Sequence, residues 1–205
     1  MGNTNNKPAI RFQGFTEAWE QRKLGETCSV TSGVMGDFML TDGQYRLTRI
    51  ETIADGFIDE HRVGYTNQKP DESFRLNPGD ILYSNINSIS HMGKVAIYQG
   101  NSELYHGINL LRLAPNYGIN PDYLLNLLNT EDKRNWARTH ANQAVSQASI
   151  NRTLLESQTI MVCQTEEQKK IGEFFSNLDN LITLHQRKYE KLMNIKKSML
   201  EKMFV

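Results

Sequence analysis

Apolar and aromatic residues recur at alternating steps of four and three along the last forty residues of the chain. This spacing is typical of a coiled-coil helix of about five heptads. Thr165 and Gln168 have the spacing of a capping box, and no proline follows them, so we expect one unbroken helix over 165–205. The repeat runs through Ile171, Phe175, Leu178, Ile182, Tyr189, Leu192, Met199 and Met203, with His185 and Lys196 in two polar positions of the series.

A helix of this length needs a second helix to cover its apolar seam. About 40 residues rise about 60 Å, which is too long for the helix to fold back on the rest of the chain. The sequence contains no second long helical pattern, so we expect the covering helix to come from another chain. The residues predicted to mediate this dimerisation are Ile171, Phe175, Leu178, Ile182, Tyr189, Leu192 and Met199.

Before residue 164 the pattern changes to short apolar runs separated by turns. The runs 47–50, 81–83 and 95–98 predict strands, and the Asn-Pro-Gly-Asp sequence at 77–80 predicts a turn before the second of them. Asn120 and Pro121 form a helix start, with an apolar stripe following at helical spacing. The fold class predicted is α+β: a mixed α/β domain over 1–164, followed by one long coiled-coil helix over 165–205.

Composition and charge narrow the possible functions. The 23 basic and 23 acidic residues give a net charge of zero, so the chain is no polycation. A nucleic-acid binder of this composition has to gather its charge on one face or share the phosphate contacts with a partner. Met1–Pro8 lacks an apolar signal core, and no apolar run is long enough to span a membrane. We expect a cytoplasmic protein with Cys28 and Cys163 as free thiols.

Catalytic motifs are not found in the sequence. It contains no phosphate-binding loop, no nucleophile elbow and no histidine pair at metal-ligand spacing, so we expect no cofactor, no metal and no enzymatic activity. The stretch 120–123, Asn-Pro-Asp-Tyr, is one near miss, because it is similar to the Asn-Pro-Pro-Tyr signature of DNA amino-methyltransferases. A small DNA adenine methyltransferase is therefore an alternative, although a capped helix start explains the same four residues.

Three stretches resemble the specificity subunits of type I restriction–modification systems. The first is 11–26, which begins Arg-Phe-Gln-Gly-Phe and contains Trp19. The second combines the turn at 77–82 with Gly-Lys-Val-Ala at 93–96, and the third runs from 147–151 into 167–171 and the long helix. The order and spacing of the three stretches make the resemblance specific.

The resemblance implies a role in DNA recognition. A full specificity subunit carries two target recognition domains, each followed by a long helix, and the two helices pair antiparallel. Each domain reads half of a split target in double-stranded DNA, and modification and restriction subunits dock on the assembly. This chain has one such domain and one helix, so we expect a homodimer, with 165–205 also docking the modification subunits. A coiled-coil adaptor that never contacts DNA is a further alternative.

The residues predicted to contact DNA come from polar loops and one strand. Amide and guanidinium side chains read base edges through paired hydrogen bonds, and short hydroxyl and imidazole groups add contacts. The loops 84–91 and 142–147 are rich in such groups, although each residue could instead be a solvated loop residue. Arg46 and Arg49 lie in an apparent strand, where they could equally form salt bridges. The candidates are Tyr45, Arg46, Arg49, Asn85, Asn87, Ser88, His91, Lys94, Gln143, Ser146 and Gln147.

Overall fold

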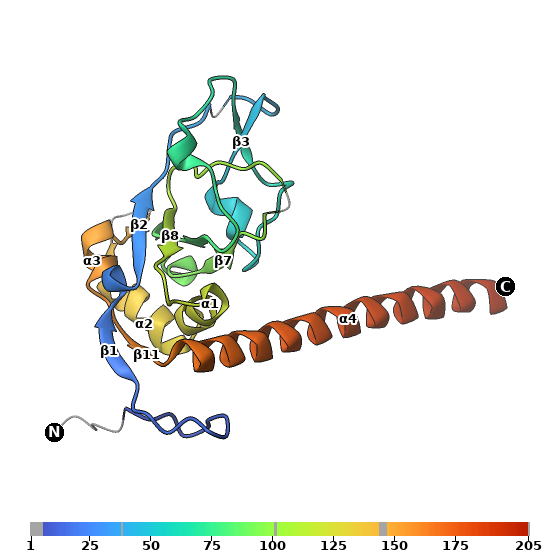
Figure 1. The fold of residues 1–205 in the computed structure, drawn as a ribbon. Helices are drawn as coiled ribbons and strands as arrows, with labels where there is room; N and C mark the ends of the chain where they lie inside the picture. Colours follow the sequence, from blue (N-terminus) through green and yellow to red (C-terminus); the bar gives the residue numbers. More distant parts are fainter. Residues whose placement is uncertain (1–5, 38, 101, 144–146, 205) are drawn as a thin grey trace.

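The computed structural model describes residues 6–37, 39–100, 102–143 and 147–204. These residues form a mixed α/β lobe from which one long helix projects (Figure 1). Within these ranges no helix is both long and apolar enough to cross a membrane. The predicted fold class, a mixed domain followed by one long C-terminal helix, is confirmed.

A four-stranded antiparallel sheet lies at the centre of the lobe. Its strand order is β2 (Cys28–Ser32), β8 (Leu111–Pro115), β5 (Ile81–Tyr83) and β7 (Val95–Ile97). Successive residues of a strand point to opposite faces, and both faces of β5 are buried. Ile81 and Tyr83 pack in one apolar cluster, whereas Leu82 packs in a second one.

Helices cover one face of this sheet and loops cover the other. The helices are α1 (Pro121–Leu128), α2 (Glu131–His140) and α3 (Arg152–Glu156), which contribute Leu124, Ala137 and Leu155 to the first cluster. The second cluster draws Ile53 and Leu104 from the loop side. Short 3-10 helices interrupt the loops: η1 (Leu24–Glu26), η2 (Ile50–Ile53), η3 (Glu72–Phe74) and η4 (Ile89–His91).

Three smaller sheets surround the central one, and all their strand pairs are antiparallel. β1 (Glu20–Lys23) pairs with β11 (Thr159–Val162), which joins the N-terminal part of the chain to the strand that precedes the long helix. β3 (Tyr45–Leu47) pairs with β4 (Gly64–Thr66) at the upper end of the lobe (Figure 1). The third sheet has the order β6 (Ile86–Asn87), β10 (Ala148–Ser149) and β9 (Asn142–Gln143).

Most predicted elements of the lobe are present in the structure. The run 81–83 forms β5, and the run 95–98 forms β7 as far as Ile97. Asn120 caps α1 by accepting a hydrogen bond from the Tyr123 backbone N–H at 2.9 Å. The strand predicted over 47–50 is wrong beyond Leu47. Residues from Ile50 onward form η2 instead, because the Thr52 hydroxyl accepts the Arg49 backbone N–H at 2.8 Å and closes a turn.

The long helix α4 (Thr165–Met203) is confirmed, but the predicted capping box is wrong. The N-cap residue is Gln164, and Gln168 does not bond back to the cap. The Gln168 side chain is buried and donates to the Cys163 carbonyl at 2.8 Å, while its oxygen accepts the Asn120 backbone N–H at 2.9 Å. Gln168 therefore ties the start of α4 to the start of α1.

The root of α4 is packed into the lobe, and the rest of the helix projects away from it. Gly172 is buried, and an added Cβ there would lie 2.8 Å from Asn120 Oδ1, so glycine allows the close approach of α4 to α1. Glu167 is also buried and accepts two hydrogen bonds from Arg11, at 2.7 and 2.8 Å. The division at residue 164 stays a prediction, and the first turns of α4 contribute to the packing of the lobe.

Candidate nucleic-acid interface

The two polar loops predicted separately from the sequence are brought together by one small sheet. β10 pairs with β6 on one side and β9 on the other, so Asn87, Ala148 and Gln143 lie in one row across three strands. Asn87 belongs to the loop 84–91, and Gln143 belongs to the stretch 142–147, more than fifty residues later. Tertiary pairing therefore builds one polar surface from two distant segments, which we call the loop sheet: β6, β9, β10 and the adjoining η4.

Asn85 holds the loop sheet in place from beneath. Its side chain donates to the Ile150 carbonyl at 3.0 Å, and the Ile150 backbone N–H donates to the Asn85 carbonyl at 2.8 Å. The residue is only 8% exposed, and its side-chain oxygen has no protein partner among the described residues. This geometry favours a role for Asn85 in positioning the loops over a role in contacting a ligand at the surface.

The side chains above Asn85 are more accessible and carry both donors and acceptors. Asn87 is half-buried, and its amide donates to Ser84 Oγ at 3.2 Å while its oxygen accepts the Ser88 backbone N–H at 2.8 Å. Ser88 and His91 are exposed and linked through Ser88 Oγ and His91 Nδ1 at 2.8 Å. Gln143 and Gln147 are exposed as well. Ser146, a further candidate, lies outside the described residues.

The remaining candidates have structural partners; Lys94 adjoins the loop sheet, and the other three lie elsewhere. The Lys94 ammonium donates to the Ala54 carbonyl at the end of η2. Arg46 Nη1 lies 3.0 Å from a Glu60 carboxylate oxygen, and Tyr45 packs edge-on against Tyr105. Arg49 is half-buried, and its guanidinium packs on Gly64: a Cβ added to Gly64 would lie 2.3 Å from Arg49 Nε. The structure therefore does not bring Tyr45, Arg46 and Arg49 into the loop sheet.

The methyltransferase-like stretch is a capped helix start whose tyrosine is buried. The Asn120 amide oxygen is engaged in the helix cap, and Tyr123 is 2% exposed. The Tyr123 hydroxyl donates to the Met161 carbonyl at 2.7 Å, and Trp19 packs edge-on against its ring. Burial raises the pKa of the Tyr123 hydroxyl. These contacts favour the structural interpretation of 120–123.

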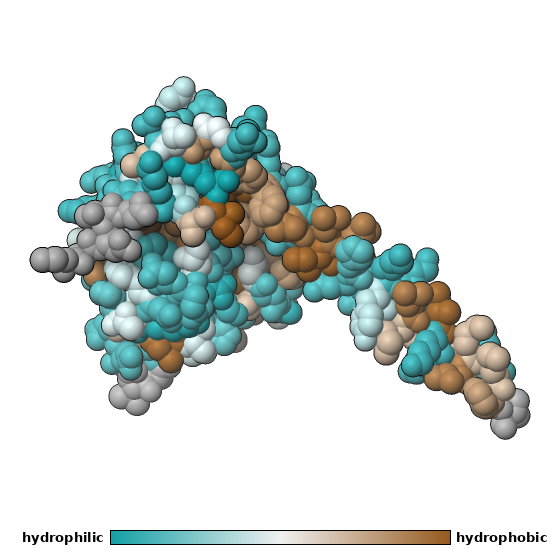
Figure 2. Space-filling model, turned by 90° about the horizontal axis from the view of Figure 1, so that it is seen from below, coloured by the Kyte–Doolittle hydropathy of each residue, from teal (hydrophilic) through white to brown (hydrophobic). Residues whose placement is uncertain are grey.

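The apolar face of α4 is wider than the predicted seam. Six of the seven predicted dimerisation residues are exposed large apolar or aromatic side chains, whereas Ile171 is half-buried at the root. Sequence reasoning missed exposed apolar residues that flank the seam on both sides; for all but Leu184, which lies one position further round the helix, a place next to the seam was the available signal. These flanking residues are Phe174, Leu181, Leu184, Met193, Ile195 and Leu200. Figure 2 shows apolar groups along the underside of α4, separated by polar ones.

Comparisons with known proteins agree with this architecture. The chain matches the family model of the type I restriction modification DNA specificity domain over residues 16–194. It is 43% identical over 194 residues to a putative type I restriction enzyme MjaX specificity subunit from Methanocaldococcus jannaschii, covering 92% of this chain and 46% of the relative. The chain thus spans about half the length of this curated relative.

Solved structures share the fold at lower identity. A chain of a type I restriction–modification assembly matches with a TM-score of 0.65 at 16% identity, covering 95% of this chain and 47% of that one. The HsdS subunit from Thermoanaerobacter tengcongensis matches with a TM-score of 0.57 at 18% identity, covering 88% and 41%. The S subunit from M. genitalium matches with a TM-score of 0.58 at 14% identity, covering 88% and 46%. These structures show the shared fold, and the family-model match over residues 16–194 shows that the chain belongs to the family of type I restriction modification DNA specificity domains.

Proposed function

We propose that this chain is a DNA sequence-specificity subunit that recognises one half of a bipartite target and directs modification and restriction subunits to it. The observation that carries the proposal is the loop sheet, where two polar segments converge on a domain of the DNA specificity family. The chain itself performs no chemistry in this scheme. Its work is to bind one sequence more tightly than others.

The base contacts are assigned to the accessible side chains of the loop sheet. Asn87, Gln143 and Gln147 carry amides, which can pair with adenine through two hydrogen bonds in the major groove. Ser88 and His91 are exposed beside them. Asn85 is assigned the role of a positioning residue because its amide is buried against Ile150. Lys94, Arg46, Arg49 and Tyr45 stay candidates for peripheral contacts that would compete with their present partners.

Neutral net charge fits a division of labour with the modification subunits. Phosphate contacts supply a large part of the affinity of most DNA-binding proteins, and they need an excess of Lys and Arg. This chain has no such excess. We infer that its partners supply many of the contacts to the DNA phosphates. The isolated chain then binds DNA weakly, and the assembled complex binds it tightly.

Two copies of the chain are proposed to pair through α4 as an antiparallel homodimer. The exposed seam supports pairing, since leaving a large apolar side chain in water forgoes about 1.5–3 kcal/mol of burial. A symmetric pair of this chain carries two recognition domains, the number that a full specificity subunit carries. The target is then two inverted copies of one half-site separated by unread bases.

Methylome sequencing of a strain that expresses this chain with its modification subunit tests the proposal. The expected result is one methylated motif with two inverted halves, which changes or disappears with Asn87→Ala or Gln147→Ala. Gln99→Ala, at an exposed amide outside the loop sheet, serves as the matched control and should leave the motif unchanged. A motif with two unrelated halves would contradict the homodimer. Methylation by the purified chain alone would favour the methyltransferase alternative.

A further inference from the structure

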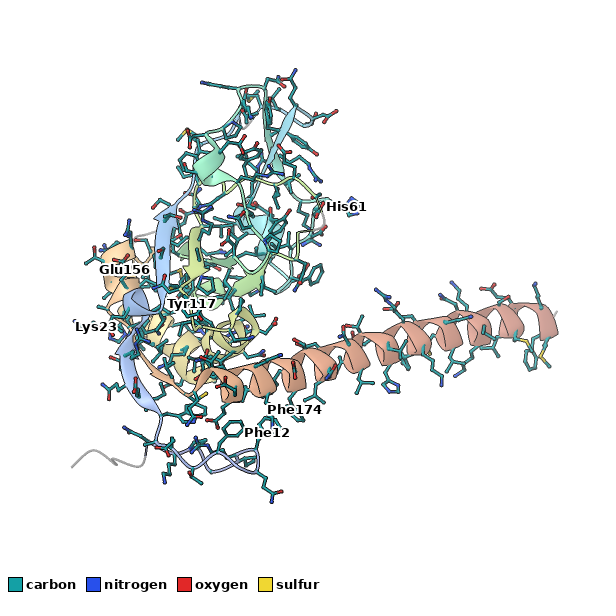
Figure 3. All side chains as sticks on the ribbon, in the orientation of Figure 1. Phe12, Lys23, His61, Tyr117, Glu156 and Phe174 are labelled. Carbon is teal, nitrogen blue, oxygen red and sulfur yellow. The ribbon has the colours of Figure 1, made fainter. Side chains whose placement is uncertain are left out.

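The N-terminal arm, residues 6–19, lies against the root of α4 and closes one end of its apolar face. The Trp19 backbone N–H donates to the Asn6 carbonyl at 2.8 Å, which closes the base of the arm. Arg11 is fixed to the buried Glu167 by two hydrogen bonds. Phe12 packs edge-on against Phe174 with ring centroids 5.8 Å apart, and Figure 3 shows these two rings together beneath α4.

The arm and the apolar face of α4 are on the same side of the helix. Ser176, Asp179 and Asn180, on the polar side of α4, line a groove that also contains Phe57 and Gln99 of the lobe. The apolar side chains therefore face away from the lobe, and the view from below shows them (Figure 2). Any helix that covers them has to lie beneath α4, where the arm blocks its path at the root (Figure 1).

We propose that the arm is a register stop: it receives the C-terminal tip of α4 from a second copy of this chain. The inference rests on the proposed pairing of two copies and adds its register. Met203 of the second copy packs on Ile171, and Phe204 of the second copy packs on the shelf formed by Phe12 and Phe174. Met203 and Phe204 are 69% and 75% exposed, so the tip is free to make these contacts.

Among antiparallel alignments, this register covers the seam over its whole length, with His185 opposite Tyr189 and Lys196 opposite Leu178. It places Phe175 opposite Met199, and Ile182 opposite Leu192, in both halves of the pair. The overlap of residues 171–203 spans about 50 Å. The covered face has a suitable size: the seven exposed seam side chains and Phe204, at roughly 100 Å² each, give about 800 Å² per copy, the size of a standard protein interface.

The neighbouring registers are worse for identifiable reasons. A shift of one heptad toward the root would place Met199 of the second copy opposite Gln168, which is buried in the lobe, and would drive the tip into the arm. A shift of one heptad away from the root would leave Ile171 and Phe175 without a partner.

Disulfide trapping tests the register directly. In the proposed pair the twofold axis passes beside residues 187 and 188, so Lys188 of one copy faces Lys188 of the other. Lys188→Cys should therefore form a disulfide-linked dimer under mild oxidation. A one-heptad shift would move the two cysteines about 10 Å further apart along the helix axis, beyond disulfide reach. The native thiols of Cys28 and Cys163 give little background, because burial raises the pKa of each to about 12.

Two further single-cysteine variants serve as matched controls. Leu192→Cys reports parallel pairing, since the two copies of residue 192 are about 15 Å apart in the proposed register but adjacent in a parallel one. Asn194→Cys lies on the polar side and should not cross-link. Cross-linking of Leu192→Cys, or a dimer by ultracentrifugation in which Lys188→Cys does not cross-link, would overturn the register. A monomer in every variant would overturn the proposed pairing itself.

The shelf is tested by truncating the tip. Phe204 is largely exposed in the single chain, so Phe204→Ala should leave the thermal midpoint of a dilute, monomeric sample unchanged. It should weaken self-association about fivefold or more and slow the cross-linking of Lys188→Cys. Tyr117→Ala, at a fully exposed aromatic outside the arm and α4, is the control. Unchanged association of Phe204→Ala would remove the shelf from the interface.

Discussion

Asn85 and Asn87 are two residues apart, but truncating each to alanine should have a different effect. Asn85→Ala should lower the stability of the fold, and Asn87→Ala should weaken specific DNA binding. Asn85→Ala removes a buried hydrogen bond to the Ile150 carbonyl. A buried polar group that loses its partner costs about 1–3 kcal/mol, and removing the unpartnered side-chain oxygen of Asn85 offsets part of that loss. We expect the free energy of unfolding to fall by about 1–2 kcal/mol.

Asn87→Ala should leave stability nearly unchanged. The side chain is half-buried, and its bonds to Ser84 and Ser88 are local ones that water can replace. We expect a change within about 0.5 kcal/mol. If Asn87 pairs with a base through two hydrogen bonds, the assembled complex loses about 1–3 kcal/mol of specific binding, roughly 5–150-fold in affinity.

The assay combines two measurements on each variant. Urea unfolding followed by tryptophan fluorescence gives the stability, and binding of the complex to cognate and scrambled duplexes at one fixed salt concentration gives the specificity. The reasoning would be refuted if Asn85→Ala unfolded like the parent chain. It would also be refuted if Asn87→Ala kept full discrimination between the two duplexes.

Three further predictions concern the scaffold. Burial lowers the pKa of His106 to about 4, so its neutral form stabilises the fold above the unfolded pKa near 6.5, and this stability is lost as pH falls toward 4. Unfolding experiments should show about 2 kcal/mol lost from this group between pH 7 and 5, a dependence that His106→Gln removes and His61→Gln retains. Gly172→Ala should lower the melting temperature, because the clash of the added Cβ with the α1 cap costs more free energy than the roughly 1 kcal/mol gained in helix propensity. A higher melting temperature would contradict the close contact. Cys28 and Cys163 should react with a thiol reagent at pH 8 only on unfolding, and rapid labelling of the folded chain would contradict their burial.

The architecture followed from the sequence because local patterns specify it. The seven-residue apolar repeat after Thr165 is unbroken by proline, and that alone predicts a helix of this length. Asn120 and Pro121 predict the start of α1 by the chemistry of capping. The error at 47–50 arose because one hydroxyl, that of Thr52, closes a turn that the apolar pattern does not reveal.

The site was only partly predictable, because polar loop residues have the same composition whether they are exposed or buried. Asn85 and Asn87 look alike in the sequence, and the partner that separates their roles, Ile150, lies 65 residues from Asn85 along the chain. For Arg46 the sequence leaves a DNA contact and a salt bridge equally open, and only the fold places a Glu60 carboxylate oxygen 3.0 Å from its guanidinium. Burial and long-range pairing decide such cases, and neither has a local signal.

The sequence by itself determined that α4 is a long helix with an uncovered seam, since helical periodicity is a property of consecutive residues. It could not determine which part of the seam is free to pack against another helix. Only the tertiary structure decided that the arm covers the root, that Gln168 and Gly172 belong to the packing of the lobe, and that the loop sheet gathers two distant segments. The physical reason is that these contacts join segments nearly fifty or more positions apart, which only the folded chain brings within reach.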